Sequence, residues 1–303
     1  MLLLPTKSSS VTRIFSFGGG VQSTAVMVLQ AQRLIMPYDA YIFANVGNDS
    51  ENPDTLEYIE KYTKPFADKH GIQFEEVQKV RRGGAKDTLV GFIERTERSI
   101  PIPARMSNGA PGNRTCTTDF KILVVDKWVK QHSFTHAIVG LGISIDEFSR
   151  MRGEEWTDRQ GKRKHGFWKR REHPLIDLRI SRHKCVEIIV KAGLPVPPKS
   201  SCFFCPFTRR AEWIEMKRET PALFDEAVRI EHIINAKRGL LEKDRVYLHA
   251  DVVPLENAVG NQLTLWAHAA KAAGYTGSAF DNETNVLKPI TEDEACEAGY
   301  CLT

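Results

Sequence analysis

Short apolar runs alternate with helical patterns along the first half of the chain. Residues 11–17 form a β-branched and aromatic run that ends at a glycine, and residues 22–34 carry apolar side chains at helical spacing. The runs at 40–46, 72–80 and 135–142 have the same strand-like character, with helical patterns between them. This alternation predicts a doubly wound, mostly parallel α/β sheet of the Rossmann-like kind, with helices on both faces.

Local start and stop signals mark the helices. Asn52-Pro53 is typical of an N-cap followed by proline at the first helical position, and Gly71 fits the end of the same helix. Pro65 inside this helix predicts a kink. Further helices are expected over residues 87–96, 118–131, 181–192, 209–218, 221–238 and 263–273.

The helical character of the last third suggests how the chain is organised. We expect a sheet domain at 1–180 and a helical C-terminal portion at 181–303, which carries a Cys-x-x-Cys turn and a cysteine-bearing tail. The composition, 42% hydrophobic and 26% charged residues, is that of an ordinary globular protein. No apolar run approaches a membrane span, so we expect a cytoplasmic protein without a membrane partner.

Three glycines join the first predicted strand to the first predicted helix, in the sequence Phe17-Gly18-Gly19-Gly20-Val21-Gln22-Ser23-Thr24. A glycine turn at this place leaves backbone N–H groups unshielded at a helix N-terminus, where the helix dipole also attracts phosphate. Neither the Gly-Lys-Ser/Thr of a Walker loop nor the pattern G-x-G-x-x-G is present. A tight turn without a ligand is the alternative interpretation.

The glycine turn resembles the PP-loop, Ser-Gly-Gly-x-x-Ser, of the adenine nucleotide alpha-hydrolase superfamily. Its neighbouring residues look like the branch that contains phosphoadenosine phosphosulfate (PAPS) reductases and ATP pyrophosphatases of the DNA-phosphorothioation type. The resemblance implies a bound adenine nucleotide, such as ATP with Mg²⁺. The residues that it assigns to the nucleotide here are Ser16, Gly18, Gly19, Gly20, Gln22, Ser23 and Thr24.

Two further loops follow predicted strands and should meet the same crevice. Asp49 and Glu51 are candidates for contact with ribose or Mg²⁺, with a polar helix-capping turn as the alternative. The segment Gly142-Ile143-Ser144-Ile145-Asp146-Glu147-Phe148-Ser149-Arg150 resembles the family's Gly-x-Arg-x-x-Glu-x-x-Arg, which closes over the nucleotide. The resemblance makes Gly142, Glu147 and Arg150 nucleotide ligands, although an ordinary ion pair between Glu147 and Arg150 is equally compatible.

Six cysteines in a chain of this kind favour metal or redox chemistry over a disulfide framework. Cys202 and Cys205 form Cys-Phe-Phe-Cys-Pro, a spacing that lets both sulfurs bind one metal or pair with each other, and Cys116 is a third candidate. An iron–sulfur cluster, a structural zinc and redox thiols are all compatible with this pattern. Cys185 is a candidate fourth ligand, and packing inside a helix is its alternative role.

The resemblance extends to adenylylsulfate reductases, which pair an upstream Cys-Cys with a downstream Cys-x-x-Cys around a four-iron cluster. Here Thr115 or Thr117 stands where the second upstream cysteine would be. Three thiolates would leave one iron open to hold sulfide. Arg114 and Lys121 match the family's Arg-x-Cys-x-x-x-x-Lys, which implies that they bind an anionic substrate beside the cluster.

Two cysteines lie close to the C-terminus, Cys296 and Cys301. PAPS reductases carry their catalytic thiol in a C-terminal Glu-Cys-Gly-Leu-His segment, which is absent here. Cys301 is therefore either a catalytic tail thiol or a surface cysteine. Upstream, the stretch 159–171 mixes basic residues with Phe167 and Trp168, which is compatible with a nucleic-acid contact or with a solvated basic loop.

Three functions remain open on the sequence. The favoured one is an ATP pyrophosphatase that adenylylates a substrate for sulfur incorporation, in DNA phosphorothioation or nucleoside thiolation, with a sulfur-donor protein such as a cysteine desulfurase as partner. The second is a PAPS or adenylylsulfate reductase that releases sulfite. The third is a non-catalytic nucleotide-binding or zinc-stapled interaction protein.

Overall fold

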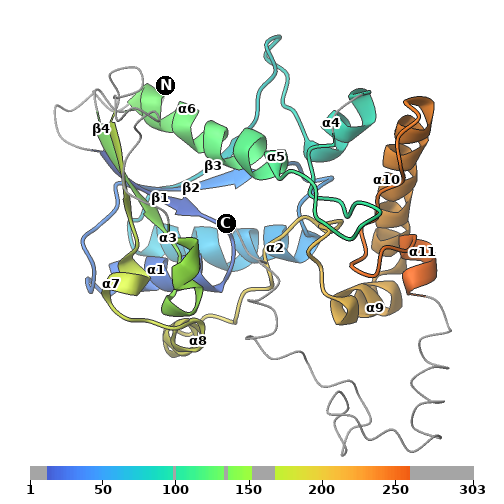
Figure 1. The fold of residues 1–303 in the computed structure, drawn as a ribbon. Coiled ribbons are helices and arrows are strands. Elements are labelled where there is room, and N and C mark those ends of the chain that lie inside the picture. The colour runs from blue at the N-terminus through green and yellow to red at the C-terminus, as the bar shows by residue number, and fades with distance from the viewer. Residues whose placement is uncertain (1–11, 98–99, 133–135, 152–167, 260–303) are drawn as a thin grey trace, which may run out of the picture. The chain divides into compact units, whose positions relative to one another are not determined.

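The computed structural model describes residues 12–97, 100–132, 136–151 and 168–259. The described chain forms two compact units (Figure 1). The first contains residues up to 89 together with 116–202, and the second contains 90–115 together with the residues from 203 onward. This division differs from the boundary expected at residue 180, because the chain leaves the first unit at 90, returns at 116 and leaves again after 202.

The first unit is built on a five-stranded sheet whose strands are all parallel. Its spatial order is β3-β2-β1-β4-β5. The strands are β1 (Thr12–Phe17), β2 (Ala40–Asn45), β3 (Phe74–Gln78), β4 (His136–Leu141) and β5 (Trp168–Glu172). The predicted α/β fold class is confirmed, and β5 shows that the end of the basic stretch 159–171 is an edge strand. The earlier part of that stretch, 159–167, lies outside the described residues.

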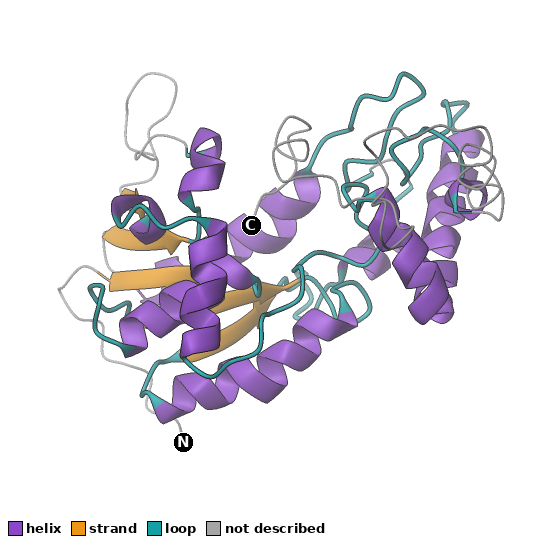
Figure 2. Cartoon of the chain, turned by 90° about the horizontal axis from the view of Figure 1, so that it is seen from below, coloured by secondary structure: helices purple, strands orange, loops and turns teal. Residues whose placement is uncertain are grey.

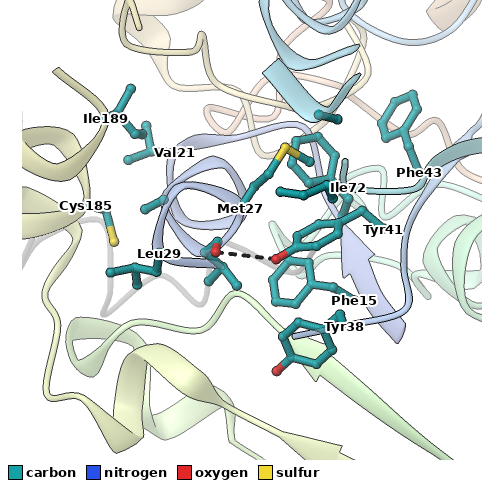
Figure 3. Close-up of a cluster of buried hydrophobic side chains, with 14 of the residues drawn as sticks. Phe15, Val21, Met27, Leu29, Tyr38, Tyr41, Phe43, Ile72, Cys185 and Ile189 are labelled. Carbon is teal, nitrogen blue, oxygen red and sulfur yellow. Dashed lines mark hydrogen bonds between the residues drawn. The ribbon is translucent and has the colours of Figure 1, made fainter. Parts of the chain in front are cut away.

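Helices cover both faces of this sheet (Figure 2). Side chains alternate along the strands, so that Phe15 and Tyr41 face one helical layer while Ile14 and Ile42 face the other. The first layer contains α1 (Val21–Ala31) and α8 (Arg182–Lys191), and the second contains α6 (Leu123–His132). Figure 3 shows the core beneath α1, where the Tyr41 hydroxyl donates to the Val26 carbonyl at 3.4 Å.

Two long helical stretches of the first unit are interrupted by a wider, π-helical turn. The first runs through α2 (Pro53–Tyr58), the π turn Ile59–Thr63 and α3 (Lys64–Lys69). Asn52 caps it as predicted, since its side chain accepts from the Asp54 N–H at 2.9 Å. The π turn comes directly before the helical turn that holds Pro65, where the missing N–H is tolerated. The expected kink therefore takes the form of a change in helix type.

The second helical stretch begins earlier than the sequence pattern predicts. It comprises α5 (Thr115–Thr117), the π turn Thr118–Ile122 and α6, so that Cys116 lies in the first helical turn. Besides β5, two short helical elements of the first unit were not predicted, a 3-10 helix at Ile145–Arg150 and α7 (Pro174–Asp177). Both are too short for a periodic pattern to identify.

The described part of the second unit is helical. It contains α4 (Leu89–Arg95), which begins at the boundary, and then α9 (Arg210–Glu219), α10 (Pro221–Leu240) and α11 (Leu255–Ala258). Trp213 and Phe224 pack edge to face at 6.3 Å between ring centroids. The helices expected at 209–218 and 221–238 are confirmed, and the one expected at 263–273 lies outside the described residues. Across the described ranges, no helix is long and apolar enough to cross a membrane.

Candidate functional site

The glycine turn lies where the strand order of the sheet reverses. β1 has β2 on one side and β4 on the other, so the chain winds outward in both directions from it. Because all strands are parallel, the loops that follow β1, β2 and β4 start at the same edge of the sheet. This edge is where open α/β sheets bind their ligands. The three loops therefore start at one edge of the sheet, and their meeting in one crevice stays a prediction.

Two glycines of these loops occupy positions that a side chain would obstruct. Gly19 has a φ of +81°, and a Cβ built there would lie 2.9 Å from Thr55 Cγ2. A Cβ at Gly142 would lie 3.2 Å from the backbone nitrogen of Ser23. The loop after β4 therefore packs directly against the first turn of α1, and a side chain at Gly142 would crowd this approach.

The serine of the PP-loop-like sequence turns back on its own loop. The Gly20 N–H donates to Ser23 Oγ at 3.1 Å, and the Ser23 hydroxyl donates to the Gly20 carbonyl at 2.9 Å. Its role in this structure is thus to fix the start of α1, as an N-terminal cap does. Thr24, in the same helical turn, is 2% exposed, and its hydroxyl has no hydrogen-bond partner among the described residues.

The two acids that follow β2 point to different surroundings. Asp49 is exposed, and its carboxylate accepts hydrogen bonds from Ser50 at 2.8 Å and Thr88 at 2.9 Å. Glu51 is 1% exposed. The sequence analysis considered these two acids together. The turn between them places the Asp49 carboxylate at the surface and buries that of Glu51.

Glu51 faces the one lysine that the sequence analysis singled out. Lys121 Nζ lies 3.2 Å from Glu51 Oε1. Apart from this ion pair, both carboxylate oxygens lack a hydrogen-bond partner among the described residues. Burial, the largest single effect, would by itself lower the pKa of Lys121, but the charge and hydrogen bond of Glu51 together with the two neighbouring thiols raise it above its ordinary value. The lysine therefore remains charged close to these thiols, which belong to Cys202 and Cys116.

Cys202 is held beside Glu51 by the backbone, since these two residues form a short antiparallel β-bridge. Cys116 lies in α5 of the same unit. Cys205 and Arg114 belong to the second unit, where the Arg114 guanidinium carbon lies 4.9 Å from the centre of the Phe207 ring. Their predicted grouping with the first two cysteines stays a prediction.

The fourth cysteine suggested as a ligand does not fit that role. Cys185 is fully buried in the hydrophobic cluster between α1 and α8 (Figure 3). Burial raises the pKa of its thiol to about 12, as expected for a cysteine packed inside a core. No three Cys, His, Asp or Glu side chains of the described residues converge on a metal-binding position. Cys296 and Cys301 lie outside the described residues.

The loop after β4 carries a partly buried ion pair. Arg150 Nη1 lies 2.5 Å from Glu147 Oε2, and the two side chains are 15% and 12% exposed. Burial raises the pKa of Glu147, and Arg150 acts in the opposite direction. Arg150 Nε and Nη2 have no hydrogen-bond partner among the described residues. Ser144 stands where the family motif has an arginine, so this position carries no positive charge. Its side chain is fully buried and donates to Asp146 at 3.4 Å.

Two parts of the site escaped the sequence analysis. Arg182, in the first turn of α8, donates to the Gln22 side chain at 2.9 Å. The segment 195–202, here called the strap, lies along α2 and ends at Cys202. Its carbonyl groups accept from the Tyr58 hydroxyl at 2.7 Å and from the Asn52 N–H at 3.1 Å. Neither feature has a local sequence signal, because both depend on segments more than a hundred residues apart.

Comparison with known proteins gives limited results. No family model matches the chain, and no curated protein matches it. Among solved structures, the chain is similar to the U34-tRNA thiolase NcsA from Methanococcus maripaludis with its [4Fe-4S] cluster. The TM-score is 0.41 at 15% sequence identity, over 78% of this chain and 73% of that chain. A functional proposal for this protein therefore depends on its own residues.

Proposed function

We propose that this protein is a PP-loop ATP pyrophosphatase that adenylylates a substrate for sulfur incorporation, with a nucleic acid as the substrate class. The observation that carries the proposal is the glycine turn of residues 18–20, which opens α1 at the reversal point of a parallel sheet. A turn of this kind presents backbone N–H groups and a helix dipole to an anion. The unpartnered hydroxyl of Thr24 in the same helical turn supports a ligand there.

The proposed reaction is a displacement at the α-phosphorus of ATP. A substrate oxygen forms a bond to this phosphorus, the bond to the α–β bridging oxygen breaks, and pyrophosphate leaves with the electron pair. The glycine turn would hold the leaving pyrophosphate, and Arg150 would supply its two unpartnered nitrogen donors to a phosphate. Mg²⁺ would arrive with ATP, and Asp49 is an exposed carboxylate at this edge of the sheet that could bind it. Catalysis would then depend on positioning and electrostatics.

The thiols of the first unit support the sulfur step. Cys202 is two residues from Ser200, which contacts the glycine turn, so about 7 Å of extended chain separates them at most. Lys121 holds a positive charge close to Cys202 and Cys116. An iron–sulfur cluster on Cys116, Cys202 and Cys205 remains part of the proposal, as does a sulfur-donor protein. The described residues do not form such a metal site, and no step above requires it.

The test is a pair of assays on anaerobically purified protein, with pyrophosphate release from ATP measured beside sulfite release from PAPS. We expect the protein to release pyrophosphate from ATP, at a rate that an acceptor RNA or DNA increases, and to release no sulfite from PAPS. Gly19→Ala should abolish pyrophosphate release because of the positive φ and the contact with Thr55. Gly193→Ala is the matched control, since Gly193 has a similar φ of +79° with no atom near its would-be Cβ.

Three other results would each replace the proposal. Sulfite from PAPS without pyrophosphate from ATP would make the protein a reductase. Nucleotide binding without turnover, together with stoichiometric zinc, would make it a binding protein. Failure of the native protein to bind any adenine nucleotide would remove the nucleotide site altogether.

A further inference from the structure

The strap (residues 195–202) is tied to α2 and to the turn before it at three points. The Tyr58 hydroxyl donates to the Pro195 carbonyl, and the Thr55 hydroxyl donates to the Lys199 carbonyl at 3.5 Å. The third contact joins the Asn52 N–H to the carbonyl of Ser201. Because these contacts follow one another along the strap, its path is determined by the first unit itself.

This path brings Ser200 against the glycine turn. A Cβ built on Gly20 would lie 3.1 Å from Ser200 Oγ, and one built on Gly19 would lie 3.5 Å from Ser200 Cβ. Gly19 provides the positive φ of the turn, and Gly20 leaves space for the Ser200 hydroxyl, which a Cβ at that position would crowd. The side chain that lies in this space ends in a hydroxyl.

The Ser200 hydroxyl lies where it could donate a hydrogen bond to an anion bound at the glycine turn. Gly20 is the N-cap residue of α1, and its own N–H is already bound to Ser23. The Gly20 N–H is therefore already used within the turn. Ser200 places a hydroxyl donor next to Gly20. A hydroxyl beside the N-terminus of a helix is well suited to a phosphate oxygen.

We propose that Ser200 is a phosphate-binding residue, whose hydroxyl donates to the pyrophosphate portion of a nucleotide held by the glycine turn. This inference rests on the proposed function, because it requires a nucleotide at that turn. It also has a consequence for the thiol. Since Cys202 follows two residues later on the same strap and is bridged to Glu51, a phosphate bound by Ser200 would fix the segment that carries Cys202.

The experiment is calorimetric titration of the full chain with ATP, with inorganic pyrophosphate and with adenosine. Ser200→Ala should weaken ATP and pyrophosphate binding about ten-fold or more, which is the usual effect of removing a hydrogen bond to a charged group. Adenosine binding should not change. Ser201→Ala is the matched control, because Ser201 contacts Asn52 through its backbone carbonyl, and its binding should stay within about two-fold of the native protein.

Each other outcome has one meaning. If Ser200→Ala binds pyrophosphate as the native protein does while Gly19→Ala has lost binding, the inference is wrong and the nucleotide site stands. If both serine variants weaken binding equally, the strap acts only through its general stability, and the inference is again wrong. If the native protein binds neither ATP nor pyrophosphate, the proposed function fails with it. Thermal melting of each variant shows whether it is folded.

Discussion

The ion pair between Lys121 and Glu51 provides a sharp quantitative prediction. Replacing Lys121 with methionine keeps the length and much of the apolar stem of the side chain but removes the ammonium. Glu51, which is 1% exposed, would then lose the cation that balances its carboxylate. A buried carboxylate without a partner is costly, because neither water nor a cation stabilises the charge.

The expected magnitude follows from the geometry. Two unit charges 3.2 Å apart attract each other by about 5 kcal/mol at an effective dielectric constant of about 20. Part of that attraction already offsets the cost of removing both groups from water, and breaking buried pairs usually costs about 3–5 kcal/mol. Lys121 keeps 26% of its side chain exposed, so we expect Lys121→Met to lose about 3 kcal/mol of unfolding free energy.

The assay is urea unfolding followed by far-ultraviolet circular dichroism. The matched control is Lys61→Met, because Lys61 and Glu57 form a lysine–glutamate pair on the surface, with side chains 61% and 59% exposed. Its unfolding midpoint should not change measurably. The double variant Lys121→Met with Glu51→Gln should recover most of the loss, since no buried charge remains. Equal midpoints for Lys121→Met and Lys61→Met would refute the reasoning.

Three further predictions concern other parts of the chain. Gly47→Ala should lower the unfolding free energy by about 3 kcal/mol, and Gly71→Ala by about 1 kcal/mol. Both glycines have a positive φ, but only at Gly47 would the Cβ lie within 2.5 Å of other atoms. Urea unfolding measures both losses. Lys237→Met should lower the unfolding free energy by about 2 kcal/mol, because the ammonium donates to three carbonyl groups in and just after α4. Hydrogen exchange should then show weaker protection of the α4 amides in the variant. Equal protection in the native and variant proteins would contradict this prediction. Burial lowers the pKa of His249, and the positive charge of Arg210 adds to this while Asp251 opposes it. The folded state therefore binds fewer protons than the unfolded one, and stability should fall as the pH drops below about 6.5. His249→Asn should weaken that pH dependence in melting experiments, and an unchanged slope would count against the assignment.

Much of the first unit was predictable because its signals are local. The strand β1, the glycine turn and the helix α1 are specified by neighbouring residues, and so is the cap that Asn52 places on α2. The parallel sheet followed from the alternation of these patterns. The order of its strands could not be predicted in this way, since it depends on pairings between segments that are far apart in the sequence.

The residues of the candidate site divide in the same manner. The glycine turn of residues 18–20 was identifiable because glycine itself indicates unusual backbone conformations, such as the positive φ of Gly19. The direction of a carboxylate is not, and Asp49 and Glu51 look equivalent in the sequence although one is exposed and the other is buried against a lysine seventy positions later. Cys185 is a similar case. Its helix was predicted from local patterns, but its burial in the hydrophobic cluster between α1 and α8 depends on tertiary packing.

By itself, then, the sequence determined the class of the fold, the place of the glycine turn and the residue types around it, because these follow from periodicity and from the conformational range of glycine. Tertiary structure alone decided that the chain crosses between two units, that Lys121 neutralises Glu51, and that the strap carries Ser200 to the glycine turn. These features arise from contacts between distant segments. Their energies depend on burial and distance, which no local pattern encodes.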